Sequence, residues 1–297
     1  MTSIIMSMYN RKKHTIEVID NLFFPSILNN ASSDKELIII DDFSSLKKET
    51  KAVVDKYLPD LRKKLGNVVF ERNEENKGFG KSYNKGINLA EGENLLITND
   101  DVYFPLGSID SLVNTLSENK NYGLVGPITN EKIVFTYQYC KQAPLINNYS
   151  KKEIKKIETF FDFVKRLMKG QRIVTDSISG FCFATKSEVI KEVGTFDETF
   201  GYGLCEDTDF SRRVNQQYSL IINPEVFIYH GSIGGETASS LMQHPIKAAY
   251  TYIINLFKYA DKWHDYKGTI KHVAEGMYRS KTGKRTVSEL FEKLYNQ

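Results

Sequence analysis

The stretch ENLLITNDDVYFP (residues 93–105) carries an apolar run directly into Asn99, Asp100 and Asp101. Adjacent carboxylates repel each other, and each loses hydration energy if the end of the strand is buried. A solvated turn would relieve that repulsion, and so would a divalent cation bound by the carboxylates. The stretch therefore predicts a buried strand whose carboxyl end is either solvated or holds a cation.

Apolar runs alternate with helical patterns on both sides of this stretch. Strands are expected at 3–10, 36–42, 67–73 and 94–100. A first helix is expected at 12–29, with a bend at Pro25. A second is expected to begin after an N-cap at Ser44 or Ser45, and a third at 79–92, with its end at Gly92. This alternation predicts an α/β fold, a parallel sheet with helices on both faces. Ligands of such sheets bind outside the carboxyl ends of the strands.

The second half of the chain has a less regular pattern. Helices are expected at 108–119 and 153–169, and a strand at 122–128. Residues 180–194 predict a strand followed by a helix, and residues 219–231 predict two short strands around Pro224. From about residue 236 the pattern is helical, with an apolar face expected from Tyr250, Ile253, Ile254, Phe257 and Tyr259.

Composition narrows the class of protein. A chain of 297 residues with 41% hydrophobic side chains can form one large domain or a domain with an appendage. A net charge of +3 does not favour a nucleic-acid-binding protein. Three cysteines without CxxC spacing indicate reduced thiols. The N-terminal segment lacks the pattern of a signal peptide, and no apolar run has the length of a membrane span, so we expect a cytoplasmic protein.

Acidic residues gather in three segments. The pairs Asp41–Asp42 and Asp100–Asp101 follow two expected strands, and CEDTDF (205–210) contains the third cluster. The first two would meet at one edge of a parallel sheet, where carboxylate oxygens suit Mg²⁺ or Mn²⁺. The glycine-rich stretch NKGFGKSYNKG (76–86) matches neither the P-loop nor the dinucleotide motif. Its glycines still allow main chain to approach a ligand at a helix N-terminus.

Taken together, these segments resemble the family 2 glycosyltransferases with the GT-A fold. SIIMSMYNR and ELIIIDDFSS are similar to the family's first two strands, NKGFGKSYNKGI to its Asn-x-Gly helix start, and LLITNDDVYFP to its Asp-x-Asp-type motif. GFCFATKSEVIKEVGTFDETFGYGLCEDTDFSRRV and NPEVFIYHG are similar to its acceptor and catalytic half. Residues 194–214 also resemble the galactosyltransferase C-terminal motif.

The resemblance implies a Rossmann-like, mostly parallel GT-A sheet flanked by helices. Residues 1–105 would form the nucleotide-binding half of a catalytic domain and residues 106–235 its acceptor and catalytic half, with 236–297 as an appended helical region. The implied reaction is inverting transfer of a sugar from a nucleotide-diphosphate donor, a UDP-sugar being favoured, to an acceptor hydroxyl on a glycan. A divalent cation, Mn²⁺ or Mg²⁺, is the implied cofactor.

The resemblance also assigns roles to individual residues. Asp207 matches the general base, with Glu206 beside it toward the acceptor. Metal contacts fall on Asp100, Asp101 and His230, although the part played by Asp101 stays open. The implied donor-binding set is Met8, Tyr9, Arg11, Asp42, Gly78, Phe79, Asn84, Asn99 and Asp100, and the implied acceptor-binding set is Gly180, Tyr202, Gly203 and Glu206.

Other interpretations remain open at this point. A sugar nucleotidyltransferase would also use an α/β sheet and Mg²⁺, but SMYNRKK lacks its glycine-rich signature. A sugar-nucleotide-binding module without catalysis is the non-enzyme alternative, and the intact Glu206–Asp207 pair argues against it. We expect Asp209 to cap its helix or pair with Arg212 or Arg213. The basic tail at Lys281, Lys284 and Arg285 could contact nucleic acid or a membrane surface, but a solvated terminus is favoured.

Overall fold

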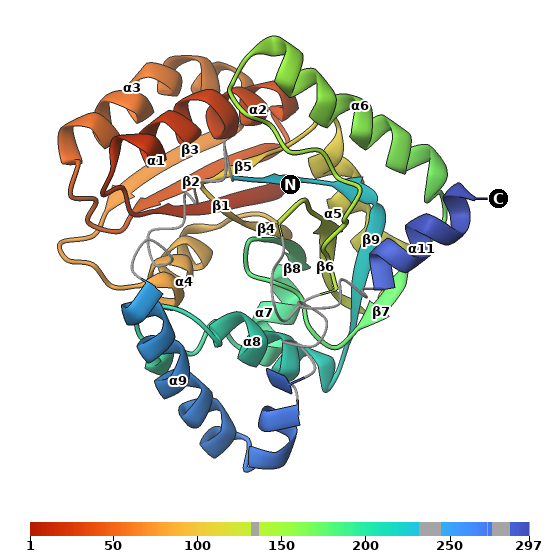
Figure 1. Cartoon of the computed structure of the whole chain (residues 1–297). Coiled ribbons are helices and arrows are strands. Elements are labelled where there is room, and N and C mark those ends of the chain that lie inside the picture. The colour runs from red at the N-terminus through yellow and green to blue at the C-terminus, as the bar shows by residue number, and fades with distance from the viewer. Residues whose placement is uncertain (132–136, 232–244, 272, 275–285, 297) are drawn as a thin grey trace.

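A computed structural model describes residues 1–131, 137–231, 245–271, 273–274 and 286–296 (Figure 1). An eight-stranded sheet has the strand order β3-β2-β1-β4-β8-β6-β9-β7, and β10 pairs with β5 beside it. The strands are β1 (Thr2–Met8), β2 (Lys35–Asp41), β3 (Asn67–Arg72), β4 (Asn94–Asn99), β5 (Val102–Tyr103), β6 (Tyr122–Ile128), β7 (Ile173–Thr175), β8 (Cys182–Lys186), β9 (Ser219–Phe227) and β10 (Tyr229–His230).

Helices cover both faces of the sheet. In Figure 1, α1, α2, α3 and α6 lie above the sheet, while α4, α7 and α8 lie below it. The helical elements are α1 (Lys13–Val18), the π-helix η1 (Ile19–Phe23), α2 (Phe24–Asn30), α3 (Lys47–Lys64), α4 (Phe79–Leu89), α5 (Ser108–Glu118), α6 (Lys151–Leu167), α7 (Ser187–Val193), the 3₁₀-helix η2 (Glu198–Phe200), α8 (Glu206–Asn215), α9 (Pro245–Lys262) and α11 (Thr286–Tyr295).

The N-terminal part of the sheet, β3-β2-β1-β4, is parallel as expected. Asp41 of β2 pairs with Met8 of β1 and with Arg72 of β3, and Ser7 of β1 pairs with Asn99 of β4. All residues of β2 are buried because helices cover both of its faces. This register brings the carboxyl ends of four strands to one edge of the sheet.

The C-terminal part of the sheet mixes strand directions. β8 runs antiparallel to both β4 and β6, β7 runs antiparallel to β9, and β6 and β9 are parallel. Because Cys182 of β8 pairs with Thr98 of β4, the start of β8 lies at the carboxyl edge, where Asn99 N donates to Phe181 O at 2.8 Å. The antiparallel strand thus carries the second half of the chain back to the edge where β1, β2 and β4 end.

Two expected helices differ from the structure. The helix expected at 12–29 is divided into α1, the π-helix η1 and α2, and Pro25 is the second residue of α2. The helix expected to end at Gly92 ends at Leu89.

The expected N-cap of α3 and the two strands around Pro224 are also wrong. The cap position of α3 is Leu46, without a side-chain cap, while Ser44 Oγ accepts from Asn10 N at 2.8 Å. β9 is continuous through Pro224. Its register with β6 jumps between Asn223 and Phe227, so the proline lies in a bulge, where no ladder N–H is needed.

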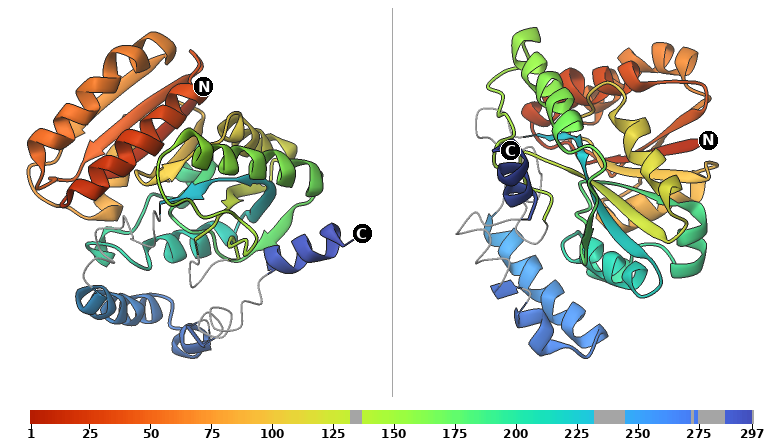
Figure 2. Two further views of the ribbon diagram at one scale, coloured as in Figure 1. Left: turned by 45° about the horizontal axis from the view of Figure 1, so that its top comes forward. Right: turned by 90° about the vertical axis from the view of Figure 1, so that its right-hand side faces the viewer.

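The C-terminal helices contact different parts of the main body (Figure 2). Phe291 of α11 stacks on Phe160 of α6 with 6.2 Å between ring centroids. The expected apolar face of α9 is only partly packed. Tyr259 is buried beside Phe200, but Tyr250, Ile253 and Phe257 are exposed. No helix among the described residues is long and apolar enough to cross a membrane. Lys281, Lys284, Arg285 and residues 232–244 lie outside the described residues.

Candidate active site at the carboxyl edge of the sheet

The carboxylate of Asp42 holds the loop that leads into α4. Its Oδ1 atom accepts from Asn73 Nδ2 and from Lys77 N, both at 2.8 Å, and its Oδ2 atom accepts from Gly78 N at 2.9 Å. Gly78 has φ 83°, and a Cβ there would lie 2.4 Å from Gly201 O. Only glycine therefore lets this loop touch the segment before α8, which joins the expected donor side to the expected acceptor side.

The residues at the end of β1 that are expected to bind the donor differ in their exposure to solvent. The side chain of Met8 is buried in the core. Tyr9 is half-buried, with the Arg11 guanidinium 5.9 Å from its ring centroid. Asp41, at the end of β2, forms an ion pair with Arg72. Tyr9 and Arg11 are thus the side chains of this set that reach solvent, whereas Met8 is packed inside.

The acids after β4 meet His230 of β10. Asp101 Oδ1 lies 3.2 Å from His230 Nε2, and Glu131 Oε2 lies 2.6 Å from His230 Nδ1. The imidazole also stacks on the Phe181 ring at 4.8 Å between centroids, and its Nε2 atom lies 3.4 Å from Asn99 Nδ2. The structure thus brings together Asp101 and His230, two of the three expected metal contacts.

Burial and charge shift the pKa values of this cluster strongly. Desolvation and the neighbouring charge of Asp101 raise the pKa of Asp100 well above its ordinary value. Burial alone would lower the pKa of His230, but the carboxylates of Glu131 and Asp101 outweigh it and raise that pKa well above its ordinary value. Burial and the charge of Asp101 thus disfavour the charged form of Asp100, while Glu131 and Asp101 favour the protonated form of the imidazole.

The chemistry of these acids fits a divalent cation. Asp101 Oδ1 is buried, and its polar neighbour within the described part of the chain is His230 Nε2 at 3.2 Å. Carboxylate oxygens such as those of Asp100 and Asp101 suit Mn²⁺ or Mg²⁺, whereas both ring nitrogens of His230 face carboxylates. No three His, Cys, Asp or Glu side chains among the described residues form a complete cation site. A bound cation would need further ligands from a substrate or water.

A second acidic pair opens α8. Asp207 Oδ2 accepts from Gly180 N at 2.9 Å, and its Oδ1 atom accepts from Thr208 N at 2.8 Å. Burial raises the pKa of Asp207 despite these hydrogen bonds. Burial and the charge of Asp207 raise the pKa of Glu206 to about 8. At neutral pH Glu206 is therefore mainly protonated, and Asp207 is the carboxylate of the pair.

The main chain before α8 is strained. Leu204 and Cys205 have φ 73° and 78°, a left-handed conformation that side chains with Cβ rarely adopt. Gly203, one of the expected acceptor residues, has φ 138° and is buried, while Tyr202 is 59% exposed. The turn thus presents Tyr202 to solvent and directs the chain into Glu206.

Aromatic residues connect the two acidic pairs. A Cβ on Gly180 would lie 3.0 Å from Phe79 Cζ and 3.2 Å from Asp207 Cβ, so Gly180 leaves room for both side chains. Phe79 packs on Tyr83 with 4.2 Å between centroids. Tyr83 donates to Thr98 O at 2.7 Å, one residue before Asn99.

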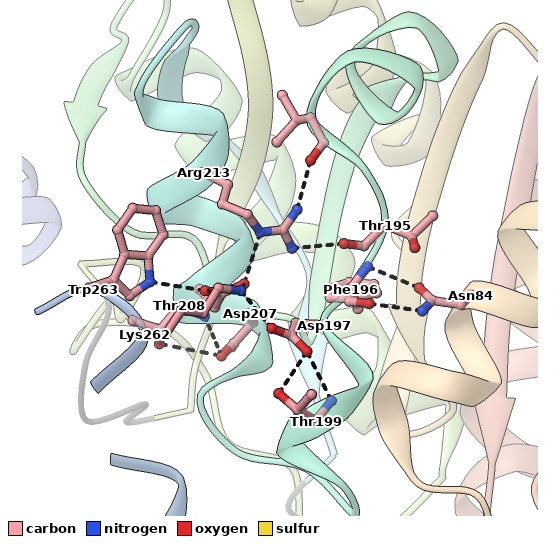
Figure 3. Close-up of polar contacts among 12 residues, drawn as sticks. Asn84, Thr195, Phe196, Asp197, Thr199, Asp207, Thr208, Arg213, Lys262 and Trp263 are labelled. Carbon is pink, nitrogen blue, oxygen red and sulfur yellow. Dashed lines mark hydrogen bonds and ion pairs between the residues drawn. The ribbon is translucent and has the colours of Figure 1, made fainter. Parts of the chain in front are cut away.

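Asn84, expected to bind the donor, is occupied by protein contacts. Its Nδ2 atom donates to Phe196 O at 2.9 Å, and its Oδ1 atom accepts from Phe196 N at 2.9 Å (Figure 3). The Nδ2 atom also donates to Glu198 Oε1 at 3.0 Å. The second Asn-x-Gly of this stretch, in the middle of α4, thus ties the helix to the segment before α8. Gly86, two residues later, lets α4 approach the sheet, because a Cβ there would lie 2.4 Å from Ile5 Cγ2.

Asp209 confirms one expectation and adds a contact that the sequence does not reveal. It pairs with Arg213 Nε at 2.8 Å, as predicted for one of the two arginines. It also pairs with Lys262 Nζ at 2.9 Å and accepts from Trp263 Nε1 at 3.0 Å. Figure 3 shows Arg213 of α8, Lys262 at the end of α9 and Trp263 directly after it, lying on the same side of α8. The fully buried Asp209 therefore fixes α9 to α8.

Sequence reasoning missed several residues of the site. Asn73 follows β3 as Asp42 follows β2, so the polar strand end was a usable signal. Glu131 and Asn255 had a weaker signal, since each contact depends on segments far apart in the chain. An isolated Asn255 within the apolar run YIINLF is the one local oddity.

Comparisons with known proteins agree with this architecture. The family model described as glycosyl transferase family 2 matches residues 3–194. Poly(ribitol-phosphate) beta-N-acetylglucosaminyltransferase TarS of Staphylococcus aureus is 26% identical over 216 residues, which cover 63% of this chain and 36% of TarS. The chain spans about a third of the length of the curated relatives it matches.

Two solved structures share the fold. GalNAc-T7 with UDP, GalNAc and Mn²⁺ has a TM-score of 0.61 at 17% identity, and the match covers 99% of this chain and 56% of that one. The mannosyltransferase PcManGT of Pyrobaculum calidifontis, in complex with GDP-Man and Mn²⁺, has a TM-score of 0.58 at 16% identity, covering 99% of this chain and 74% of that one. These matches confirm the expected GT-A architecture, including the mixed but mostly parallel sheet.

Proposed function

The chain belongs to glycosyl transferase family 2, and on that premise we propose that it moves a sugar from a nucleoside-diphosphate donor to an acceptor hydroxyl with inversion. Members of this family transfer sugars, so the expectation of a glycosyltransferase is confirmed at the level of the family. One observation supports the proposed inverting transfer from a nucleoside-diphosphate sugar. Two desolvated acidic pairs, Asp100–Asp101 and Glu206–Asp207, are connected through Phe79 and Tyr83 at one sheet edge.

Asp207 has the properties of a general base. In inverting transfer, the acceptor oxygen forms a bond to the anomeric carbon while the bond from that carbon to the diphosphate breaks. The hydroxyl proton passes to a carboxylate, and a base with a pKa moved toward neutrality does this best. Burial raises the pKa of Asp207, and the N–H groups of Gly180 and Thr208 fix its orientation.

Glu206 serves the acceptor in a different way. Its pKa of about 8 keeps it protonated at neutral pH. A buried carboxylic acid can donate a hydrogen bond, and Glu206 Oε2 makes none with the described residues. We assign it to the acceptor, where it would donate to a sugar oxygen and leave proton removal to Asp207.

Asp100 and Asp101 would hold the divalent cation. A bound Mn²⁺ or Mg²⁺ would neutralise the charge that develops on the leaving diphosphate. His230, the third expected metal contact, lies 3.2 Å from Asp101 Oδ1 at the same edge, and the carboxylates of Glu131 and Asp101 favour its positively charged form. Preoriented charge of this kind stabilises a developing anion without reorganisation.

A UDP-sugar is the favoured donor and a carbohydrate hydroxyl the favoured acceptor. UDP is present in the GalNAc-T7 structure, whereas the PcManGT structure contains GDP-Man. The nucleotide therefore needs a direct test. UDP-sugars and GDP-sugars would be incubated with the chain and Mn²⁺, and release of nucleoside diphosphate would be measured with and without saccharide acceptors. Formation of sugar nucleotide from nucleoside triphosphate and sugar phosphate would instead identify a nucleotidyltransferase.

Replacement of Asp207 by Asn tests the base. The amide keeps the side-chain shape but cannot take a proton, so we expect turnover to fall by ~10²–10⁴-fold. Donor binding, measured by calorimetry with the UDP-sugar, should be unchanged. Asp162→Asn, an exposed position on α6, is the matched control and should keep wild-type turnover. Full turnover in Asp207→Asn would contradict the assignment.

A further inference from the structure

One face of α9 contacts the segment that leads into α8. Four residues of α9 at helical spacing, and Trp263 directly after the helix, make polar contacts with residues 197–212: Asn255, Lys258, Tyr259, Lys262 and Trp263. The opposite side of α9 carries Tyr250, Ile253 and Phe257, all exposed. The packed side of α9 is thus mainly a set of hydrogen-bond donors, an unusual choice for a helix that only completes a core.

Asn255 makes the most demanding of these contacts. Its side chain is 1% exposed, and its Nδ2 atom lies 2.8 Å from Phe200 O, 2.8 Å from Gly203 O and 2.9 Å from Leu204 O. The two N–H groups of this amide are therefore shared among three main-chain carbonyls of the turn at 200–205. A buried carbonyl that loses its donor is costly, so the turn depends on this amide.

The turn needs such support because its main chain is strained. Leu204 and Cys205 both adopt left-handed φ values, and neither is glycine. Such conformations persist only when surrounding contacts impose them. Cys205 O then accepts from Asp209 N at 2.8 Å, so the strained turn is also the start of α8.

We propose that Asn255 is a positioning residue for sugar transfer, which holds the turn at 200–205 in the conformation that places Glu206 and Asp207. The inference rests on the proposed function, since Asp207 is there the general base. Among the described residues, the hydrogen bonds of Asn255 go to main-chain carbonyls of the turn and not to Asp207. It acts through the main chain of the turn, and α9 is kept in place by Lys262 and Trp263, which bind the fully buried Asp209 (Figure 3).

Asn30 provides a matched control elsewhere in the chain. It is 6% exposed, and its Nδ2 atom donates to two main-chain carbonyls, Ser26 O at 2.9 Å and Phe104 O at 3.1 Å. It lies at the end of α2, on the opposite face of the sheet from α8 (Figure 1). Asn30→Asp therefore removes a comparable buried donor without touching the turn.

The thiols report on the turn independently of catalysis. Cys205 is in the turn, and all three cysteines, Cys140, Cys182 and Cys205, are buried. N-ethylmaleimide modification of each would be followed by peptide mass mapping. In Asn255→Asp we expect Cys205 to react about tenfold faster, the factor for loss of roughly one hydrogen bond, with Cys140 and Cys182 unchanged. Asn255→Ala is the second variant, should a carboxylate there prevent folding.

The kinetic readout separates positioning from stability. We expect turnover of Asn255→Asp to fall by about 10²-fold, because small displacements of a catalytic group cost this much, while the Kd for UDP stays within about twofold. Asn30→Asp should lower stability but keep turnover. Wild-type Cys205 reactivity and turnover in both Asn255 variants would overturn the proposal, as would equal acceleration at all three thiols. If the wild type releases no nucleoside diphosphate from any sugar nucleotide, the proposed function fails, and the Cys205 rates still decide whether Asn255 holds the turn.

Discussion

At Glu206, burial decides the charge state more than the residue type does. The carboxyl group has no hydrogen bond from the described residues to its Oε2 atom and sits beside the carboxylate of Asp207. Its pKa of about 8 leaves two adjacent acids with different protonation at neutral pH. Environments that push the pKa values of two neighbouring acids apart are typical of sites that need both a proton donor and a base.

The raised pKa of Glu206 also predicts how stability depends on pH. The folded state holds this proton more tightly than the unfolded chain, so its contribution is present below pH 4.5 and is lost as pH rises through about 8. Glu206→Gln should remove this loss, which amounts to roughly 1.4 kcal/mol for each pH unit between the unfolded and folded pKa values. Urea unfolding at pH 5 and pH 8 measures it, with the exposed Glu74→Gln as control. Equal pH slopes in wild type and Glu206→Gln would contradict the assignment.

Among the elements, strands were predictable and the contacts between loops were not. The run ELIIIDD predicts β2 because a strand buried on both faces is continuously apolar. The parallel register then follows, and with it the meeting of Asp42 and Asn99 at one edge. The predictions of a helix end at Gly92 and an N-cap at Ser44 were wrong because both residues form hydrogen bonds with distant parts of the chain. Gly92 N donates to Ser3 Oγ, and Ser44 Oγ accepts from Asn10 N.

The loop before α4 offers a test at this scale. Gly78→Ala must keep φ 83° and place Cβ 2.4 Å from Gly201 O, so both loops would have to separate. Gly107 has φ 80°, and a Cβ there would have no neighbouring atom within 4 Å. Gly107→Ala should therefore lose only the conformational cost of a left-handed residue, about 1–2 kcal/mol.

We therefore expect Gly78→Ala to lose more unfolding free energy than Gly107→Ala in urea titrations. It should also lose turnover, which Gly107→Ala should keep. Equal behaviour of the two variants would show that the contact between residues 78 and 201 is unimportant.

In the whole molecule, one sheet edge gathers segments from both halves of the chain. The parallel strands bring Asp42 and Asp100, the antiparallel β8 returns Gly180 to the same edge, and α8 adds Asp207. Sequence motifs indicated each of these residues. The helical pattern after residue 236 indicated a helix there but not its hold on the turn at 200–205, because Asn255 lies 51 to 55 residues from the carbonyls that it contacts.

The central claim is a division of labour, in which Asp100 serves the cation and donor while Asp207 serves the acceptor proton. Calorimetric titration of UDP, with and without Mn²⁺, into wild type, Asp100→Asn and Asp207→Asn tests it most directly. The account predicts that Mn²⁺ strengthens UDP binding in wild type and in Asp207→Asn, and that Asp100→Asn loses this dependence. Mn²⁺-dependent binding that survives in Asp100→Asn, or disappears in Asp207→Asn, would contradict it.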